Sequence, residues 1–173
     1  MSFYVSGKFV YLAHPRTASM ATEKLLQEVF PEGQTTKEHH GGIKNMHLYG
    51  NELIFCTIRD PIDVIVSWWI LNQEWWDKGD IVNFINHYRH TYLQDLMFFH
   101  FDTCKGSCIR YESLQSELNK IISYFNREPK KLPIVNTTED KPNPYSYYNR
   151  EVMNVMWERF PLDMALYHRR VIL

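Results

Sequence analysis

The sequence has no long apolar run, few cysteines and almost no net charge. A membrane-spanning helix needs roughly 20 consecutive apolar residues, and no stretch of this 173-residue chain reaches that length. We therefore expect no membrane partner. The net charge of -1 gives no basic field for wrapping nucleic acid, so nucleic acid is not an expected partner either. Any anion that the protein binds must be held by local groups.

The chain contains only three cysteines. Cys56 lies in an apolar segment, and the spacing of Cys104 and Cys108 is wider than a redox C-x-x-C motif, so we interpret all three as reduced structural thiols. Residues 1–8 lack the basic start and long apolar middle of a secretory signal, which predicts a cytoplasmic protein. The length predicts one compact domain over residues 1–173.

Three segments share one pattern, in which a short apolar strand ends at a polar turn and a helix begins at once. The predicted strands are 9–13, 53–58 and 108–111, and the helices that follow them are 20–30, 62–72 and 113–125. Further helical patterns cover 81–101 and 150–160, and prolines predict a long loop over 128–148. This order is typical of α/β proteins. The near-continuous apolar strands favour a central parallel sheet with helices on both faces, which is a three-layer sandwich.

The turn after the first predicted strand combines one arginine with small residues. It reads His-Pro-Arg-Thr-Ala-Ser over 14–19, and Met20 follows. Backbone N–H groups at a helix start lie at the positive end of the helix dipole and can hold an anion, and Arg16 adds a full charge. The G-x-x-x-x-G-K-[ST] pattern is absent, so we expect a terminal phosphate or phosphosulfate here. When this turn is considered alone, the alternative is an ordinary strand–turn–helix segment that binds no ligand.

A second turn places Arg59 at a strand end and Ser67 about two helical turns later. Both can face one anion, which would take a bidentate contact from the guanidinium and a hydrogen bond from the hydroxyl. In the structural alternative, Asp63 caps the helix and Arg59 pairs with Asp60 or Asp63 at the surface. Ligands of parallel sheets bind beyond the carboxyl ends of the strands. If the three strands are neighbours, we expect Arg16, Arg59 and Tyr111 to converge there.

Segments 14–19 and 59–67 together resemble the signature of the sulfotransferase family, whose members use 3′-phosphoadenosine 5′-phosphosulfate. The resemblance implies a P-loop nucleotide-kinase-like fold and two sets of binding residues. The 5′-phosphosulfate would be bound by Arg16, Thr17, Ala18 and Ser19, beside Met20, and the 3′-phosphate by Arg59 and Ser67. Segment 110–114 resembles a later family element, in which a tyrosine, here Tyr111, lies near the adenine. Segment 143–167 looks like the closing helix of carbohydrate-type members.

The sequence departs from the family pattern at three places. Ser113 stands where the family usually has aspartate. Ala18 stands where many members have glycine, and we expect it to exclude a left-handed backbone there. The Arg-x-Gly element near the end is absent, and Lys141, Arg150 and Arg169 are equal candidates for its charge.

Sulfuryl transfer requires a base that accepts the proton of the acceptor hydroxyl. The family often has a histidine before its second strand, and a neutral imidazole suits this task near pH 7. His40, which precedes a glycine, is the first candidate, and His39 is the second. A solvated loop is the alternative for the two histidines. No cluster of Asp, Glu or Cys at ligand spacing accompanies them, so we expect no metal.

The expected reaction is sulfuryl transfer to a hydroxyl of a saccharide or small molecule, with adenosine 3′,5′-bisphosphate as the product. Aromatic residues between 68 and 99 either wall an acceptor cleft or pack in the core. A P-loop-like nucleotide kinase is the alternative enzyme. A non-catalytic nucleotide-binding module of the same fold is the third candidate. The sequence determines neither the acceptor nor the oligomeric state.

Overall fold

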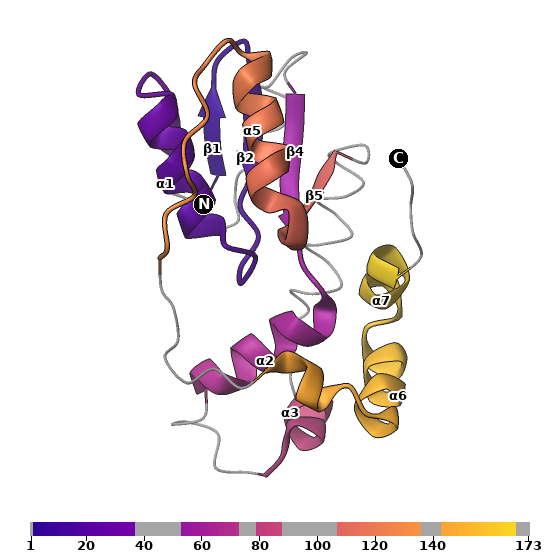
Figure 1. The fold of residues 1–173 in the computed structure, drawn as a ribbon. Helices are drawn as coiled ribbons and strands as arrows, with labels where there is room; N and C mark the ends of the chain where they lie inside the picture. The colour runs from indigo at the N-terminus through magenta and orange to yellow at the C-terminus, as the bar shows by residue number, and fades with distance from the viewer. Residues whose placement is uncertain (1, 37–52, 73–78, 88–106, 136–142, 169–173) are drawn as a thin grey trace. The chain divides into compact units, whose positions relative to one another are not determined.

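A computed structural model describes residues 2–36, 53–72, 79–87, 107–135 and 143–168. The chain divides into two compact units, whose elements are drawn in Figure 1. Unit 1 comprises Met1–Ile58 and His100–Thr137, and unit 2 comprises Arg59–Phe99 and Thr138–Leu173. Each unit has its own hydrophobic core. The single domain that the chain length predicts stays a prediction.

Unit 1 contains a five-stranded mixed sheet with the strand order β3-β1-β2-β4-β5. The strands are β1 (Ser2–Val5), β2 (Phe9–Leu12), β3 (Gln34–Thr36), β4 (Leu53–Ile58) and β5 (Cys108–Arg110). The pairs β2–β4 and β4–β5 are parallel, whereas β1 runs antiparallel to both β2 and β3. The α/β class is therefore confirmed, and the three predicted strands are parallel neighbours. The sheet is mixed because β1 and β3, which the sequence pattern did not identify, extend it at one side.

The β1–β2 hairpin depends on a tight turn at Gly7. The φ angle of Gly7 is 70°, a conformation that glycine adopts without the steric penalty of a side chain. The Lys8 N–H donates to the Val5 carbonyl at 3.0 Å, which closes the turn. The sequence signal that could have predicted this hairpin is a short run of apolar residues next to a Ser-Gly pair.

The core of unit 1 lies on one face of the sheet. Helices α1 (Ser19–Val29) and α5 (Leu114–Tyr124) both pack there, and a single turn of 3₁₀ helix, η3 (Tyr111–Ser113), precedes α5. The largest buried members of this core are Phe3, Phe9, Tyr11, Phe30, Phe55, Leu25 and Leu26. Val10 and Leu12 on the opposite face are also buried. Among the described residues of unit 1, both helices cover the same face, so the three-layer arrangement stays a prediction.

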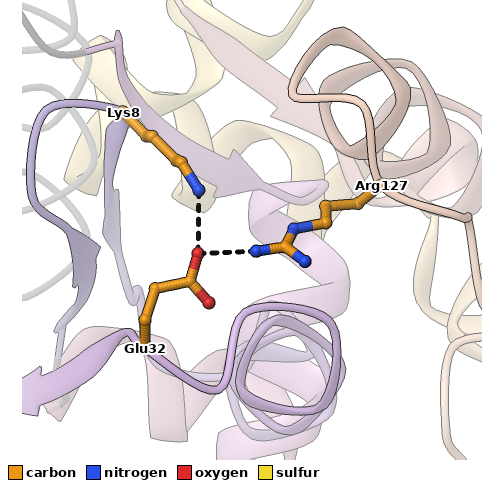
Figure 2. A network of polar contacts seen from close by, with 3 residues as sticks. All are labelled: Lys8, Glu32 and Arg127. Carbon is orange, nitrogen blue, oxygen red and sulfur yellow. Dashed lines mark hydrogen bonds and ion pairs between the residues drawn. The ribbon is translucent and has the colours of Figure 1, made fainter.

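A charged cluster lies near the start of β2. Figure 2 shows Lys8 and Arg127 pointing at the carboxylate of Glu32, and both donate to its Oε1, at 2.8 Å and 3.0 Å. The two cations also lie over the ring of Phe30, 5.5 Å and 5.8 Å from its centroid. The pKa of Glu32 is lowered to about 2, chiefly by the hydrogen bond from Lys8, then by a hydrogen bond from the Glu32 backbone N–H, and to a smaller extent by the bond from Arg127. The cluster joins the β1–β2 turn to the segments that follow α1 and α5.

Gly33 allows the chain to pass close to the sheet after α1. A Cβ atom at this position would collide with the ring of Phe3, which is fully buried. Neither the ring nor the backbone has room to move within a closely packed core. Glycine is therefore required here by packing.

Unit 2 is helical over its described residues. It contains α2 (Pro61–Asn72), α3 (Ile81–His87), η4 (Pro144–Tyr147), α6 (Arg150–Arg159) and α7 (Pro161–His168). Its core combines Ile62, Ile65, Val66, Phe84, Ile85, Val152, Met156, Phe160 and Met164. The predicted helix over 150–160 is confirmed as α6. The periodicity did not predict α7, although the resemblance implies a closing helix over 143–167, a segment that contains η4, α6 and most of α7. Helix α7 begins at a proline, which suits a first helical turn. The remainder of the predicted 81–101 helix lies outside the described residues. No helix among the described ranges is long and apolar enough to cross a membrane.

Candidate functional site

The turn between β2 and α1 contains two residues with left-handed backbone. Arg16 has a φ angle of 64°, and Ala18 has φ and ψ angles of 60° and 27°. Our expectation that Ala18 excludes this conformation is therefore wrong. A left-handed conformation costs a non-glycine residue roughly 1–2 kcal/mol. The turn must lead from a buried strand into α1 within a few residues, and the contacts around it impose the conformation.

Two hydrogen bonds within the turn hold this backbone in place. The buried Thr17 hydroxyl donates to the carbonyl of His14 at 2.7 Å. The Nδ1 of His14, which is also buried, lies 2.9 Å from the carbonyl of Pro15. Because a carbonyl oxygen only accepts, this contact requires the proton on Nδ1. The turn is fixed by its own residues before any ligand binds.

Helix α1 begins at Ser19 without a capping side chain and without an acidic residue in its first turn. The residue before the helix is Ala18, which has no side-chain oxygen to accept from the first N–H groups, and no acidic residue stands in the first turn. The partial positive charge of a helix start is normally offset by such groups. Arg16 and Ser19 are half-buried, and Met20 is half-exposed. The local charge around this turn therefore favours an anion.

The predicted residues Arg16 to Met20 do not all have the same role in this turn. The Thr17 side chain holds the turn together through the His14 carbonyl. Its hydroxyl proton is therefore directed at the backbone, and any donor that Thr17 offers to a ligand is its N–H group. Arg16 supplies the formal charge of the turn, and Ser19 supplies a hydroxyl at the first helical position.

The second predicted turn, at the start of α2, has a different construction. The Nε and Nη2 atoms of Arg59 both lie 2.5 Å from Oδ2 of Asp63. Oδ1 of Asp60 accepts from the Ile62 N–H at 2.9 Å and caps the helix. The Arg59–Asp63 pair is the structural alternative that the sequence left open, with Asp60 in the capping role instead of Asp63. Both members of the pair are largely buried, at 12% and 14% side-chain exposure.

Tyr148 contacts this turn through Asp60, although about ninety positions separate Tyr148 from Arg59 in the sequence. Burial raises the pKa of its phenol, and a hydrogen bond to Asp60 raises it further. Tyr148 therefore remains protonated and donates to the Asp60 carboxylate. No local sequence signal connects these two residues, because the contact depends on how η4 packs against α2.

The other predicted residues lie as follows. Ser67 is buried within α2, and Tyr111 begins η3 directly after β5 and is exposed. Arg150 is exposed at the start of α6, and the Trp69 ring packs edge-on against Tyr147 at 5.4 Å. The remaining candidates lie outside the described residues: His39, His40, Lys141, Arg169 and the aromatic residues Trp75, Trp76, Tyr88, Tyr92, Phe98 and Phe99.

The condition for the predicted convergence of side chains, that the three predicted strands are parallel neighbours, is met. Leu12, Cys56 and Cys108 form one row across β2, β4 and β5, so the three strands end at the same edge. Arg16 and Tyr111 follow two of these strands within unit 1. Arg59 follows β4 as the first residue of unit 2. The convergence of all three side chains stays a prediction.

Comparisons of the chain with family models, curated proteins and solved structures found no match. Within the described ranges, no three His, Cys, Asp or Glu side chains come together as a metal site requires. His39 and His40 are not among these residues, so a metal-free site stays a prediction.

Proposed function

We propose that the protein is a sulfotransferase, which moves a sulfuryl group from 3′-phosphoadenosine 5′-phosphosulfate to an acceptor hydroxyl. The observation that carries the proposal is the β2–α1 turn, with its left-handed backbone at Arg16 and Ala18 and a helix start that has neither a capping side chain nor an acidic residue in its first turn. Such a turn suits a terminal phosphate group. The resemblance of segments 14–19 and 59–67 to the family signature supports the choice of donor.

In the proposed reaction, a bond forms between the acceptor oxygen and sulfur while the bond from sulfur to the 5′-phosphate oxygen breaks. The acceptor proton passes to an imidazole, with His40 as the first candidate and His39 as the second. Negative charge grows on the leaving 5′-phosphate, and Arg16 together with the N–H groups of the turn stabilises it. Groups that are fixed before the reaction do this without a reorganisation cost.

The second turn supports a rival hypothesis. Asp63 already binds the guanidinium that the proposal assigns to the 3′-phosphate. A nucleotide-binding module without transferase activity would need only the first turn, and the Arg59–Asp63 pair favours it. The P-loop-like nucleotide kinase would require a Lys and Ser/Thr pair that the first turn lacks.

Calorimetry with three nucleotides distinguishes these candidates. We expect metal-independent binding of adenosine 3′,5′-bisphosphate that is tighter than binding of adenosine 5′-monophosphate, because only the bisphosphate engages both turns. Equal affinities for these two nucleotides would favour the module. Binding of ATP only with Mg²⁺, together with ATP turnover, would favour the kinase.

A transfer assay tests the reaction itself. Labelled donor is offered with phenols, steroids, amines and oligosaccharides, and sulfated product is separated and counted. Simultaneous His39→Ala and His40→Ala replacement should abolish transfer and leave bisphosphate binding intact. If the wild-type protein binds the bisphosphate but sulfates no member of the panel, the sulfotransferase hypothesis is contradicted. The non-catalytic nucleotide-binding module is then the favoured function.

A further inference from the structure

Two cysteine side chains face each other across β4 and β5. Cys56 and Cys108 are register partners on these parallel strands, and their Sγ atoms are 3.3 Å apart without a disulfide bond. Partner residues on neighbouring strands have Cα atoms about 5 Å apart. A disulfide bond spans Cα–Cα distances of roughly 4.4–6.8 Å. The two sulfur atoms can therefore join with only a small movement of the side chains.

We propose that Cys56 and Cys108 are a thiol–disulfide pair, which forms an intramolecular disulfide bond with a small-molecule disulfide such as oxidised glutathione. The pair does not depend on the proposed transferase function. It replaces our interpretation of these two residues as purely structural thiols.

The exposure of the two cysteines determines the order of reaction. Cys108 is partly exposed on β5, the last strand in the sheet order, whereas Cys56 is fully buried on β4. An external disulfide therefore reaches Cys108 first, because thiol exchange requires access to the attacking sulfur. Cys56 is already in contact with the sulfur that it must attack in the second step.

The reaction is a two-electron oxidation of the pair. The Cys108 thiolate attacks one sulfur of oxidised glutathione, forms a mixed disulfide and releases one glutathione thiolate. Cys56 loses its proton and attacks the Cys108 sulfur, which forms the Cys56–Cys108 bond and releases the second glutathione. The protein loses two hydrogen atoms in total, and oxidised glutathione is reduced to two glutathione molecules.

Peptide mapping tests the pairing directly, because trypsin places the three cysteines in three different peptides. These are residues 45–59, 90–105 and 106–110. Folded protein is incubated with excess oxidised glutathione, quenched in acid, alkylated and digested. We expect the linked peptides 45–59 and 106–110, with Cys104 alkylated, and the intact mass should fall by two hydrogen atoms. The Cys56–Cys108 link should exceed both links to Cys104 by more than about tenfold, because the two thiols are held in contact.

Two controls separate geometry from general thiol reactivity. Protein treated in guanidinium chloride should lose the preference for the Cys56–Cys108 link, because Cys104 and Cys108 are four positions apart and meet more often in the unfolded chain than either meets Cys56. The Cys104→Ser variant should form the Cys56–Cys108 bond as fully as the wild type. The proposal is overturned if all thiols of the folded protein stay reduced, if Cys104 is in the main linked product, or if Cys108 stops at the glutathione adduct.

Discussion

The two strand-to-helix turns follow neighbouring parallel strands and have the same order of elements. They differ in the charged groups that they contain. The β2–α1 turn contains backbone N–H groups, two left-handed residues and one arginine, with no acidic residue in the first turn of its helix. The turn before α2 contains an arginine that a carboxylate already binds and a second carboxylate that caps the helix. The first turn therefore has no carboxylate in the first turn of its helix, whereas the second turn supplies two carboxylates of its own.

The comparison shows that an arginine at a strand end is not sufficient evidence of an anion site. What matters is whether a residue of the same turn already neutralises it. Asp63 stands four positions after Arg59, which is the spacing at which helical side chains meet. If the second turn does bind a phosphate, the anion must compete with Asp63 for the guanidinium.

The largest expected effect comes from removing the charge of the first turn while keeping its backbone. The Arg16→Gly variant retains the left-handed conformation and lacks the guanidinium, so calorimetry should show adenosine 3′,5′-bisphosphate binding weakened by roughly 10- to 100-fold. Circular dichroism should show an unchanged fold. If this variant binds the bisphosphate with wild-type affinity, the first turn is not part of the binding site.

A second variant tests whether Asp63 restrains Arg59. The Asp63→Asn variant removes a negative charge next to the guanidinium, and bisphosphate affinity should rise by roughly three- to tenfold, as expected for the loss of one nearby like charge. The matched control is Asp60→Asn, which changes the net charge equally and keeps an oxygen for the helix cap. An equal rise in both variants would mean that only the net charge matters.

A third variant measures the strain in the first turn. The Ala18→Gly variant should raise the free energy of unfolding by about 0.5–1 kcal/mol, which is the relief of the left-handed conformation less the greater entropy of the unfolded glycine. Ala21→Gly in the same helix should lower it by about 1 kcal/mol. Chemical denaturation measures both changes, and destabilisation by Ala18→Gly would contradict the strained geometry.

The smallest effect concerns pH and lies away from both turns. The pKa of Glu32 is lowered to about 2 in the folded protein, chiefly by the hydrogen bond from Lys8. The Glu32 carboxylate therefore stabilises the fold at pH values above its ordinary pKa of 4.5. That contribution is lost as the pH falls from 4.5 towards 2. The difference in unfolding free energy between wild type and Glu32→Gln should be constant near neutral pH and shrink over this interval. A difference that does not vary with pH would contradict the ion pairs.

The sequence predicted the strands and helices that have a strong local pattern. The apolar strand before Arg59 and the helix periodicity around Leu118 are examples, because burial of one face leaves a regular spacing of side chains. The short β3 and the helix that begins at Pro161 were not predicted. The three residues of β3 are too few to show a periodic pattern of apolar side chains. The boundary between α6 and α7 contains no glycine that would mark the end of a helix.

The candidate site was predictable only in part, because its distinguishing contacts are not local. Arg16 and Ser19 were identified from their place after a strand. The conformation of Ala18 was not, since steric preference alone argues against it and only the assembled turn imposes it. The bond of Tyr148 to Asp60 depends on tertiary packing, which a single sequence does not encode in any short pattern.

The strand order has a consequence for synthesis of the chain. Strands β1, β2 and β3 all come from residues 2–36, together with α1, so this part can pair as soon as it leaves the ribosome. Strand β4, which covers the other side of β2, is translated later. Until it arrives, the apolar β2 exposes an unpaired edge, and such edges attract strands of other chains. Slowing translation between residues 36 and 53 should therefore increase aggregation of the nascent protein.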